Sequence, residues 1–411
     1  MTMNSRVLLF GGSRQTMRRA DELGIEPLLL QRPADHDESY RPLVTALRVV
    51  DYDDTAAVLA AARDLHRRWP FDRAVSVTEA GMLAAARVNE LFGLGGNPVS
   101  SVRLLKDKAR MRSVLNGIGL SPVAAAVVTG PAGIRRFGAE HGFPVIVKPV
   151  DASASVGVSR VDGPEGVAAA WSVANGLGLR RMLVEEYLSG PEISVEAFSF
   201  GTGRHHVVAL TAKTTLPNFV EVGHVVPAPV PEDVAPAITS QVTALLNAVG
   251  HRDGPSHTEL KLTSAGPRVI ESHNRQGGDR ITDLVEQVYG VDVIKLGLAW
   301  ATGKLEPWAA APAADGAAAI RFMTPPPGVV GAITGVDEAR ARPGVVGVYL
   351  DVAPGDTIRE VRSSRDRAGS VVARAADAAT ATVLASSAAE RIRFQRVSSA
   401  GRGDGRDAAA G

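Results

Sequence analysis

The chain of 411 residues contains no cysteine. This absence excludes disulfide bonds, thiolate metal sites and a cysteine nucleophile, and it fits a reducing compartment, so we expect a cytoplasmic protein. The sequence also lacks an uninterrupted run of about 18 apolar residues, and we therefore expect no membrane-spanning helix. Its first dozen residues enter a strand and a glycine turn at once, which leaves no room for a signal peptide.

An excess of charge of one sign is missing as well. The chain has 45 basic and 44 acidic residues, a formal net charge of +1 with neutral histidines. Such a balance gives no overall field that would attract nucleic acid or an anionic membrane, and we expect neither partner. Any binding of anions must therefore come from the chemistry of a local site.

Residues 1–95 alternate short apolar runs with helical periods. Strands are predicted at 7–10, 27–31, 47–51 and 74–78, with helices at 13–23, 54–68 and 79–92. This alternation indicates a parallel α/β layer. The turn at Gly11 and Gly12 resembles part of a dinucleotide fingerprint, but the full G-x-G-x-x-G pattern is missing, so a ligand cradle and a tight strand-to-helix connection both stay open.

The stretch 144–160, PVIVKPVDASASVGVSR, ends a short apolar run on Lys148 and continues into a loop of Asp, Ser and Gly. Lysine is scarce, with 7 among the 45 basic residues. Its ammonium group can lie against phosphate oxygens, while Ser153 and Ser155 supply hydroxyl groups and Gly157 lets the backbone approach closely. The alternative is a strand-end lysine that lies beside a surface loop.

Lys106 and Lys108 are predicted to begin a helix that runs to about residue 117. The apolar side of this helix is predicted to contain Ala109, Met111, Leu115 and Ile118. Two cations at a helix N-terminus oppose the helix dipole, and a bound phosphate would explain them. A solvated basic turn is the alternative.

Residues 182–188, MLVEEYL, and 192–200 are predicted to form two strands around a Gly-Pro break. Glu185 and Glu186 are adjacent, so only one of them can point to a given face of the strand. A strand that passes into a linker with free backbone groups can bind an adenine edge, which presents a donor and an acceptor side by side. Two solvated glutamates are the alternative.

Segment 256–279 contains two predicted strands joined by a Ser-Ala-Gly turn. In such a hairpin Glu259 and Glu271 can face each other, where two carboxylates repel unless a cation lies between them. Oxygen ligands of this kind suit Mg²⁺, which also takes phosphate oxygens. The alternative pairs the glutamates with Lys261 and Arg268 on a solvent face.

Together these segments resemble the ATP-grasp superfamily over residues 1–305. The resemblance implies that Lys108 and Lys148 bind the α- and β-phosphates of ATP and that the loop 151–157, with Ser153, Ser155 and Gly157, is the flap over the triphosphate. It implies that the adenosine contacts are made by Glu185, Tyr187, Leu188 and Glu192, the first through the adenine amino group and the last through the ribose hydroxyls.

The resemblance further implies that Glu259 and Glu271 bind Mg²⁺ or Mn²⁺ and that Arg275 stabilises an acyl phosphate. One position departs from the family pattern E-x-N-x-R, because His273 replaces the usual asparagine ligand. Either the imidazole of His273 binds the metal, or Asn274 does so through a local bulge. We favour His273, and the number of metal ions stays open.

The segments 271–280 and 319–373 resemble the L-amino acid ligase branch, which includes dipeptide synthetases and ligases of natural-product pathways. This resemblance implies an α/β and α+β fold with a Rossmann-like N-terminal domain, an ATP-grasp core and a biotin-carboxylase-like C-terminal domain. The expected domains are 1–100 (Rossmann-like), 101–183 (ATP-grasp A subdomain), 184–308 (ATP-grasp B subdomain), 309–395 (C-terminal α+β) and 396–411 (a disordered tail).

The implied activity is the ATP-dependent joining of a carboxylate and an amine, such as amino acids or peptides, through an acyl phosphate with release of ADP and phosphate. Lys148 and Arg275 would be the catalytic residues, and the closed flap would exclude water. We also expect a homodimer. Two alternatives stay open: a carboxylase of the same fold that activates bicarbonate, and a nucleotide-binding protein without turnover.

Substrate-binding residues are expected in two segments. They are Lys213, Phe219, Glu221 and His224 in the first segment, and Gly277, Gly278 and Asp279 before a predicted helix at 281–289. Glu221 can pair with the amino group of a substrate. For His224 a structural role is the alternative, and Glu79, at the end of a predicted strand, is a further candidate.

Overall fold

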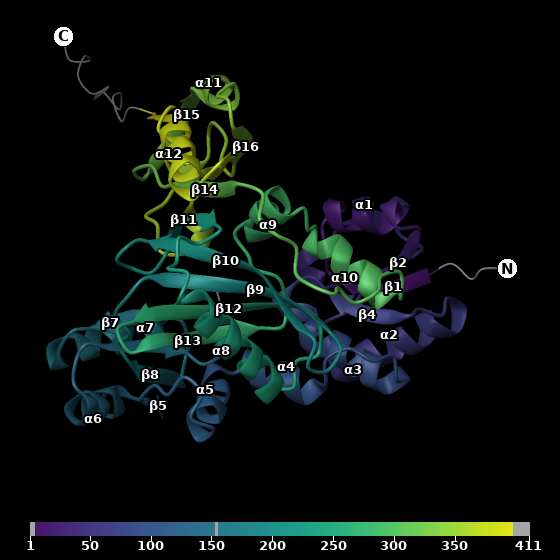
Figure 1. Ribbon diagram of the computed structural model, residues 1–411, viewed down its shortest axis with the longest axis horizontal. Coiled ribbons are helices and arrows are strands. Elements are labelled where there is room, and N and C mark those ends of the chain that lie inside the picture. Colours follow the sequence, from purple (N-terminus) through teal and green to yellow (C-terminus); the bar gives the residue numbers. More distant parts are fainter. Residues whose placement is uncertain (1–4, 153–154, 398–411) are drawn as a thin grey trace, which may run out of the picture.

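The computed structural model describes residues 5–152 and 155–397 (Figure 1). These residues form a four-stranded N-terminal sheet, a four-stranded sheet called here the A sheet, an eight-stranded sheet called here the large sheet, and a three-stranded C-terminal sheet. The predicted flap residue Ser153 and the predicted tail from residue 398 onward lie outside the described residues.

The N-terminal domain is a parallel α/β layer, as the alternation of its segments predicts. Its sheet has the order β3-β2-β1-β4 with all pairs parallel. The strands are β1 (Ser5–Phe10), β2 (Ile25–Gln31), β3 (Ala46–Val49) and β4 (Arg73–Ser76). The helices are α1 (Arg14–Glu22), α2 (Thr55–Arg68) and α3 (Met82–Phe92), with short 3-10 turns η1 (Pro33–Asp35), η2 (Glu38–Leu43) and η3 (Glu79–Gly81).

Both faces of the N-terminal sheet are buried, which explains the continuous apolar run in β1. Leu8 and Phe10 pack with α2 and α3, whereas Val7 and Leu9 point to the opposite face. That face is covered by α1 and by α10 (Val293–Ala301), which returns from far along the chain and contributes Leu298 (Figure 1). The N-terminal domain is thus tied to the large sheet through α10.

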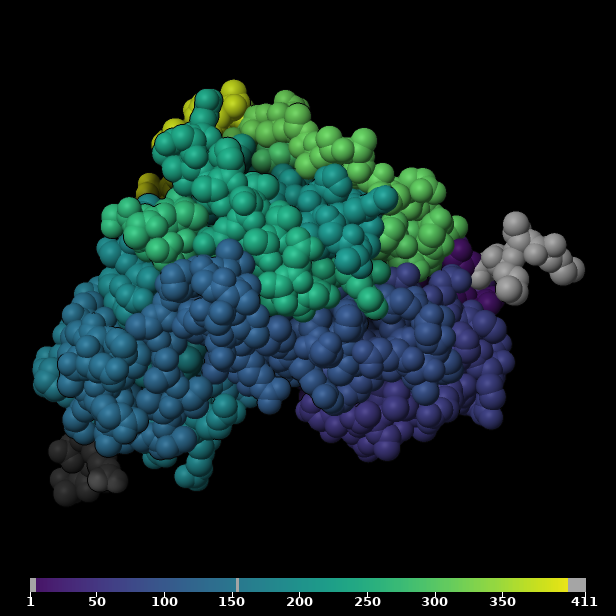
Figure 2. Space-filling view, turned by 60° about the horizontal axis from the view of Figure 1, so that its bottom comes forward, coloured from purple at the N-terminus to yellow at the C-terminus, as the bar shows by residue number. Residues whose placement is uncertain are grey.

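The A sheet is antiparallel with the order β5-β8-β6-β7. Its strands are β5 (Ala125–Val128), β6 (Val145–Pro149), β7 (Ser159–Val161) and β8 (Met182–Glu186). The accompanying helices are α4 (Val99–Lys106), α5 (Lys108–Gly117), α6 (Pro131–His141) and α7 (Val167–Gly176), with η4 (Pro164–Gly166). Figure 2 shows this part and the N-terminal domain side by side, with residues of the large sheet above them.

The large sheet has the order β13-β12-β9-β10-β11-β14-β18-β16, antiparallel throughout. Its first five strands in the chain are β9 (Glu192–Phe200), β10 (His205–Thr215), β11 (Glu221–Val226), β12 (Asp253–Thr263) and β13 (Gly266–His273). Helices α8 (Ala235–Ala248), α9 (Ile281–Tyr289) and α10 accompany them. Both sides of β9 are buried: Ile193, Val195 and Ala197 share one core cluster, and Phe198 and Phe200 belong to another on the opposite side.

The C-terminal residues extend the large sheet. Strands β14 (Ala317–Met323), β16 (Val345–Leu350) and β18 (Gly369–Ala375) continue it, while β15 (Gly328–Thr334), β17 (Thr357–Ile358) and β19 (Arg393–Arg396) form the three-stranded sheet. The remaining helices are α11 (Val336–Arg340), α12 (Ala378–Ala389) and η5 (Ser364–Asp366). The predicted disordered tail therefore starts too early, because Arg396 still pairs with Val330.

The predicted helix beginning at Lys106 is in fact two helices. Asp107 ends α4 and begins α5, where its carboxylate accepts a hydrogen bond from the Arg110 backbone nitrogen at 3.0 Å. Lys106 therefore lies in the last turn of α4, where the dipole favours a cation, and Lys108 alone of the two lies at a helix N-terminus. The expectation for Ile118 was wrong: it lies beyond the end of α5 and is 56% exposed.

Two predicted domain boundaries fall inside secondary-structure elements. The one after residue 100 cuts α4, and the one after residue 183 cuts β8, which belongs wholly to the A sheet. These elements form as hydrogen-bonded units, so the boundaries move to before Val99 and after Glu186.

Aspartates cap several helices. Asp54 and Asp292 accept hydrogen bonds from the backbone N–H groups of Ala57 and Lys295, each at 2.9 Å, at the starts of α2 and α10.

The helices are short, and α2 and α8 have 14 residues each. In the part of the chain that the structure describes, no helix has the length and apolar character required to cross a bilayer.

A buried histidine predicts a pH dependence of stability. His251 Nε2 lies 3.3 Å from the Gly254 carbonyl oxygen, while the buried Nδ1 has no hydrogen-bond partner among the described residues. Burial lowers the pKa of His251 to about 4. The unfolded chain therefore binds a proton between about pH 6.5 and pH 4 that the folded chain does not, so stability falls as the pH drops through this window.

We expect this histidine to account for a loss of up to about 3 kcal/mol in the free energy of unfolding from pH 6.5 to pH 4. Urea unfolding at several pH values measures it. The free energy of unfolding of His251→Asn should depend less steeply on pH than that of the wild type. His141→Asn, at the exposed end of α6, should keep the wild-type pH dependence. Equal slopes for His251→Asn and the wild type would contradict this assignment.

Candidate functional site

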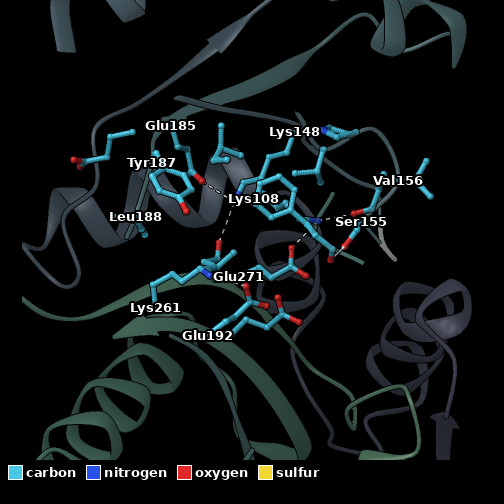
Figure 3. Close-up of a pocket in the computed structure, with 18 of the residues that line it drawn as sticks. Lys108, Lys148, Ser155, Val156, Glu185, Tyr187, Leu188, Glu192, Lys261 and Glu271 are labelled. Carbon is cyan, nitrogen blue, oxygen red and sulfur yellow. Dashed lines mark hydrogen bonds and ion pairs between the residues drawn. The ribbon is translucent and has the colours of Figure 1, made fainter. Parts of the chain in front are cut away.

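A cavity lies between the A sheet and the large sheet (Figure 3). We call it the first cavity; its volume is about 840 Å³, including open solvent at its mouth. From the A-sheet side it is lined mainly by Lys108, Lys148, Ser155, Val156, Glu185, Tyr187 and Leu188. From the large sheet it is lined by Glu192, Phe219, Glu221, Glu259, Lys261, Ile270 and Glu271. Most of the residues predicted to bind nucleotide thus line one cavity.

The two lysines predicted to bind phosphate point into this cavity from the A-sheet side. Lys108 Nζ lies 3.1 Å from a carboxylate oxygen of Glu271 and 2.6 Å from the Ala152 carbonyl oxygen. Lys148 Nζ lies 2.6 Å from a carboxylate oxygen of Glu185. Both lysines are buried. Both side chains line the same cavity, and their role toward phosphate stays a prediction.

A buried arginine that the sequence prediction missed holds Glu185. Arg112 Nε donates to Glu185 Oε1 at 2.7 Å, and its other nitrogens donate to the carbonyl oxygens of Ser121 and Val269. Burial alone would raise the pKa of Glu185, but the charges of Lys148 and Arg112 outweigh it and lower that pKa. Glu185 is therefore an ionised anchor between two cations in this structure, and a contact with adenine stays a prediction.

The residues predicted to contact the nucleoside lie where β8 ends. Tyr187 N donates to the Pro144 carbonyl oxygen at 3.3 Å, and the Arg160 guanidinium lies 4.3 Å from the centre of the Tyr187 ring. Glu192, at the start of β9, forms ion pairs with Lys213 at 3.1 Å and Lys261 at 3.2 Å. The carboxylate of Glu192 therefore faces cations from two neighbouring strands.

The predicted flap contacts the opposite wall of the cavity. Ser155 Oγ donates to the Phe219 carbonyl oxygen at 3.2 Å, which links the loop after β6 to the β10–β11 turn. Ser155 and Phe219 both have positive φ angles, 56° and 66°. Gly157 lies beside the cavity, since a Cβ atom there would be 3.1 Å from Pro149. Its φ of 75° explains the glycine.

The two predicted metal carboxylates face each other across the hairpin. Glu259 and Glu271 are direct partners in the β12–β13 ladder, as predicted. The alternative pairing with Lys261 and Arg268 on a solvent face is wrong. Instead Glu259 lies 2.6 Å from Lys213, and both glutamates line the first cavity.

Nearby cations keep these carboxylates ionised. For Glu259, burial would raise the pKa, but Lys213 lowers it. For Glu271, burial acts the same way, and Lys108 lowers the pKa. Burial likewise opposes the charge on Lys213, but its contacts with Glu259, Glu192 and Glu221 raise the pKa of this lysine. The site thus contains charged acceptors and charged donors in close proximity.

The donor chemistry fits a magnesium ion that also binds phosphate. Mg²⁺ is commonly held by one or two carboxylates, substrate phosphates and water. Glu259 and Glu271 supply two ionised carboxylates on neighbouring strands. Over residues 5–152 and 155–397, no three or more His, Cys, Asp or Glu side chains are already arranged to hold a metal ion. The predicted trio with His273 is therefore not preassembled, and phosphate oxygens would have to supply further ligands.

Of the two candidates for a third ligand, His273 lies next to the carboxylates. His273 Nε2 is 2.9 Å from Glu271 Oε1. Asn274 Nδ2 instead lies 3.6 Å from the sulfur of Met82 in the N-terminal domain. The side chains at these two positions point in different directions, and the geometry favours His273 over Asn274.

A second cavity adjoins the first and shares Ser155, Glu221, Glu259 and Glu271 with it. Its other lining residues are Lys213, His224, His257, His273, Arg275, Gly278, Asp279, Ile281 and Ser364. Several residues predicted to bind substrate are therefore brought together next to the first cavity. Gly277 lies just behind this wall, where its N–H donates to Glu196 at 3.2 Å.

Arg275 reaches the second cavity while bound to the N-terminal domain. Its Nε and Nη2 donate to one oxygen of Glu79 at 3.0 and 2.8 Å. Burial raises the pKa of Glu79, but His273 and Arg275 outweigh this effect, and the net shift is downward. The further candidate Glu79 is thus placed beside Arg275.

The C-terminal domain closes the second cavity. Arg367 donates to Asp279 through both terminal nitrogens, and Asp279 also lies 3.3 Å from His224 Nε2. Ser364 Oγ donates to Glu221 Oε2 at 3.1 Å. Burial would raise the pKa of Asp279, but Arg367 and His224 lower it. Three predicted substrate residues are therefore held by contacts that the sequence alone did not indicate.

A buried histidine in the wall of the second cavity is paired with a buried glutamate behind it. Glu196 Oε1 lies 2.7 Å from His257 Nδ1, and His257 Nε2 lies 3.2 Å from Glu259. Burial lowers the pKa of His257, but Glu196 and Glu259 outweigh it and raise the pKa to about 9. The sequence prediction missed this pair. The available signals were an acidic residue within an apolar strand, and a histidine two positions before Glu259 on the same strand face.

Three family models match the chain. The ATP-grasp N-terminal domain matches residues 17–96, the ATP-grasp domain matches residues 141–283, and the L-amino acid ligase C-terminal domain 2 matches residues 321–396. In chain order, the three matches fall on the N-terminal domain, on the A sheet with the first five strands of the large sheet, and on the C-terminal strands.

Two named enzymes are similar over part of their length. Alanine–anticapsin ligase of Bacillus subtilis is 25% identical over 235 residues, which cover 51% of this chain and 50% of that enzyme. Carnosine synthase 1 of Mus musculus is 29% identical over 273 residues, which cover 59% of this chain and 32% of that enzyme. The alignments thus span half or less of these relatives.

The fold also matches a solved structure. The crystal structure of L-amino acid ligase from Bacillus licheniformis superposes with a TM-score of 0.84 at 22% identity, covering 97% of this chain and 100% of that chain. At this identity the match concerns the fold, and it confirms the fold class expected from the sequence.

Arg112 offers a test of how the cleft is held together. Replacing it with methionine leaves the buried Glu185 with a single cationic partner, so Arg112→Met should lower the free energy of unfolding by about 3–5 kcal/mol. Arg110→Met is the matched control, because Arg110 lies exposed on the same helix; its effect should stay within about 0.5 kcal/mol. Urea unfolding measures both, and equal effects of the two variants would contradict the anchoring role.

Proposed function

The chain belongs to the ATP-grasp superfamily and carries an L-amino acid ligase C-terminal domain, and from this premise we propose that it joins two amino-acid-like substrates through an amide bond. One observation carries the proposal. Lys108 and Lys148 from one side, and Glu259 and Glu271 from the other, line one cavity that adjoins a second, highly charged cavity. This arrangement suits a triphosphate next to the group that it activates.

The first cavity would hold ATP. Lys108 and Lys148 supply positive charge for the phosphates, and the backbone around Tyr187 supplies groups for the base. Glu259 and Glu271 would hold Mg²⁺, which supplies charge neutralisation and orientation of the phosphates when bound. The Ser155–Phe219 contact would keep bulk water away from the reacting end.

The second cavity would hold the substrates. A carboxylate oxygen attacks the γ-phosphorus of ATP, the bond to the bridging oxygen breaks, and ADP leaves. The amine of the other substrate then attacks the carbonyl carbon of the acyl phosphate, loses a proton, and expels inorganic phosphate. Arg275 lies where its guanidinium can stabilise negative charge on the reacting carboxyl group, and Glu79 fixes the orientation of that guanidinium.

Acidic groups in the second cavity suit substrates with an amino group. Glu79, Glu221 and Asp279 each lie in or beside the cavity and are each held by a cation or a hydroxyl group of the protein. An ammonium group of a substrate can pair with these carboxylates in place of some of their partners in the protein. Amino acids are therefore the proposed substrates, a class that also includes the alanine in the name of the alanine–anticapsin relative.

The test is phosphate release from ATP in a matrix of amino-acid pairs, with mass spectrometry of the amide product. Arg275→Ala should lower phosphate release at least about 100-fold, because the charge opposite the reacting carboxyl group is lost. ADP affinity should change little, since Arg275 does not line the first cavity.

The matched control is Arg268→Ala, on β13 before Arg275 and outside both cavities, which should keep its turnover. Unchanged turnover in Arg275→Ala would remove this residue from the proposed mechanism. Phosphate release that requires bicarbonate but no amino acid would indicate the carboxylase alternative instead.

A further inference from the structure

Glu196 and His257 face each other in the large sheet. They are direct partners in the β9–β12 ladder, and both side chains are buried. Glu196 Oε1 lies 2.7 Å from His257 Nδ1 and also accepts a hydrogen bond from Ser194 Oγ at 3.0 Å. A buried carboxylate and imidazole at this distance hold each other in one orientation.

The pair is fixed from a third direction by a backbone group. The second oxygen of Glu196 accepts a hydrogen bond from the Gly277 N–H at 3.2 Å. A Cβ atom at Gly277 would lie 2.9 Å from Glu196 Oε2 and 3.0 Å from His257 Nδ1. The backbone thus packs directly onto the pair, and a side chain at this position would displace it.

The other end of His257 reaches a predicted metal ligand. Its Nε2 lies 3.2 Å from Glu259 Oε1, the same oxygen that lies 2.6 Å from Lys213. His257 and Glu259 are two residues apart on one strand, so their side chains share a face. Because both contacts end on Oε1, they orient the carboxylate and leave its other oxygen for a cation.

We propose that Glu196 and His257 are a positioning pair that holds the Glu259 carboxylate in the orientation required to bind Mg²⁺ with the nucleotide. The proposal rests on the proposed function, because it assigns Glu259 to the metal. The pair acts through Glu259. Partners of this kind behind a metal ligand typically change metal affinity 10- to 100-fold when they are removed.

Two replacements of His257 separate its two contacts. Asparagine places an amide nitrogen near the Nδ1 position, so His257→Asn keeps the contact with Glu196 and loses the contact with Glu259. Glutamine places its amide nitrogen near the Nε2 position, so His257→Gln can still donate to Glu259. Glu196→Gln keeps the size of the side chain and removes the charge behind the imidazole.

The measurement is ADP binding by isothermal titration calorimetry over a series of Mg²⁺ concentrations. His257→Asn should weaken the apparent Mg²⁺ affinity about 10- to 100-fold while metal-free ADP affinity stays at the wild-type value. His257→Gln should recover part of this loss, and Glu196→Gln should show an intermediate loss. A role in stability alone would change the unfolding temperature without this dependence on metal.

His251→Asn is the matched control, since His251 is equally buried but lies outside both cavities. It should keep the wild-type dependence on Mg²⁺. If His257→Asn fails to fold, Gly277→Ala tests the pair through its packing contact and should weaken the Mg²⁺ affinity in the same way. A folded His257→Asn or Gly277→Ala with wild-type Mg²⁺ dependence overturns the proposal. If the wild-type protein binds ADP without any effect of Mg²⁺, the proposed function itself fails.

Discussion

The cleft between the A sheet and the large sheet depends on a balance of charge. Two facing carboxylates must be compensated by cations from distant parts of the chain. Glu259 and Glu271 are brought together by one short hairpin, and their repulsion would open it without partners. Lys213 comes from the adjacent part of the large sheet, whereas Lys108 comes from a helix beside the A sheet. The closed cleft is therefore also the arrangement in which the charges are balanced.

The same principle links the outer domains to the second cavity. The N-terminal domain contributes Glu79 to Arg275, and the C-terminal domain contributes Arg367 to Asp279. Each ion pair joins segments far apart in the chain and lies beside the proposed reacting groups. The same buried ion pairs thus join the domains and shape the second cavity, and each buried charge there has a partner that offsets its cost of desolvation.

Local patterns predicted much of the fold and part of the site. A short turn between alternating strands was sufficient to predict that Glu259 and Glu271 face each other, because hairpin pairing depends on neighbouring residues. Arg112 and Arg367 could not be found in this way, since their partners lie 73 and 88 residues away in sequence. The prediction of one helix from Lys106 is wrong because Asp107, a good N-cap residue, ends one helix and begins the next.

The continuity of the large sheet has a mechanical consequence. Strands β14, β18 and β16 are hydrogen-bonded into the sheet that carries Glu259, so the C-terminal domain and the strands around Glu259 form one body. The A sheet is a separate ladder that meets this body through side chains such as Ser155 and Arg112. A swing of the A sheet would open the first cavity and withdraw Ser155 from the second, while Glu221 and Asp279 keep their contacts with the C-terminal domain. Under the proposed function, exchange of the nucleotide would then require no separation of the large sheet from the C-terminal domain.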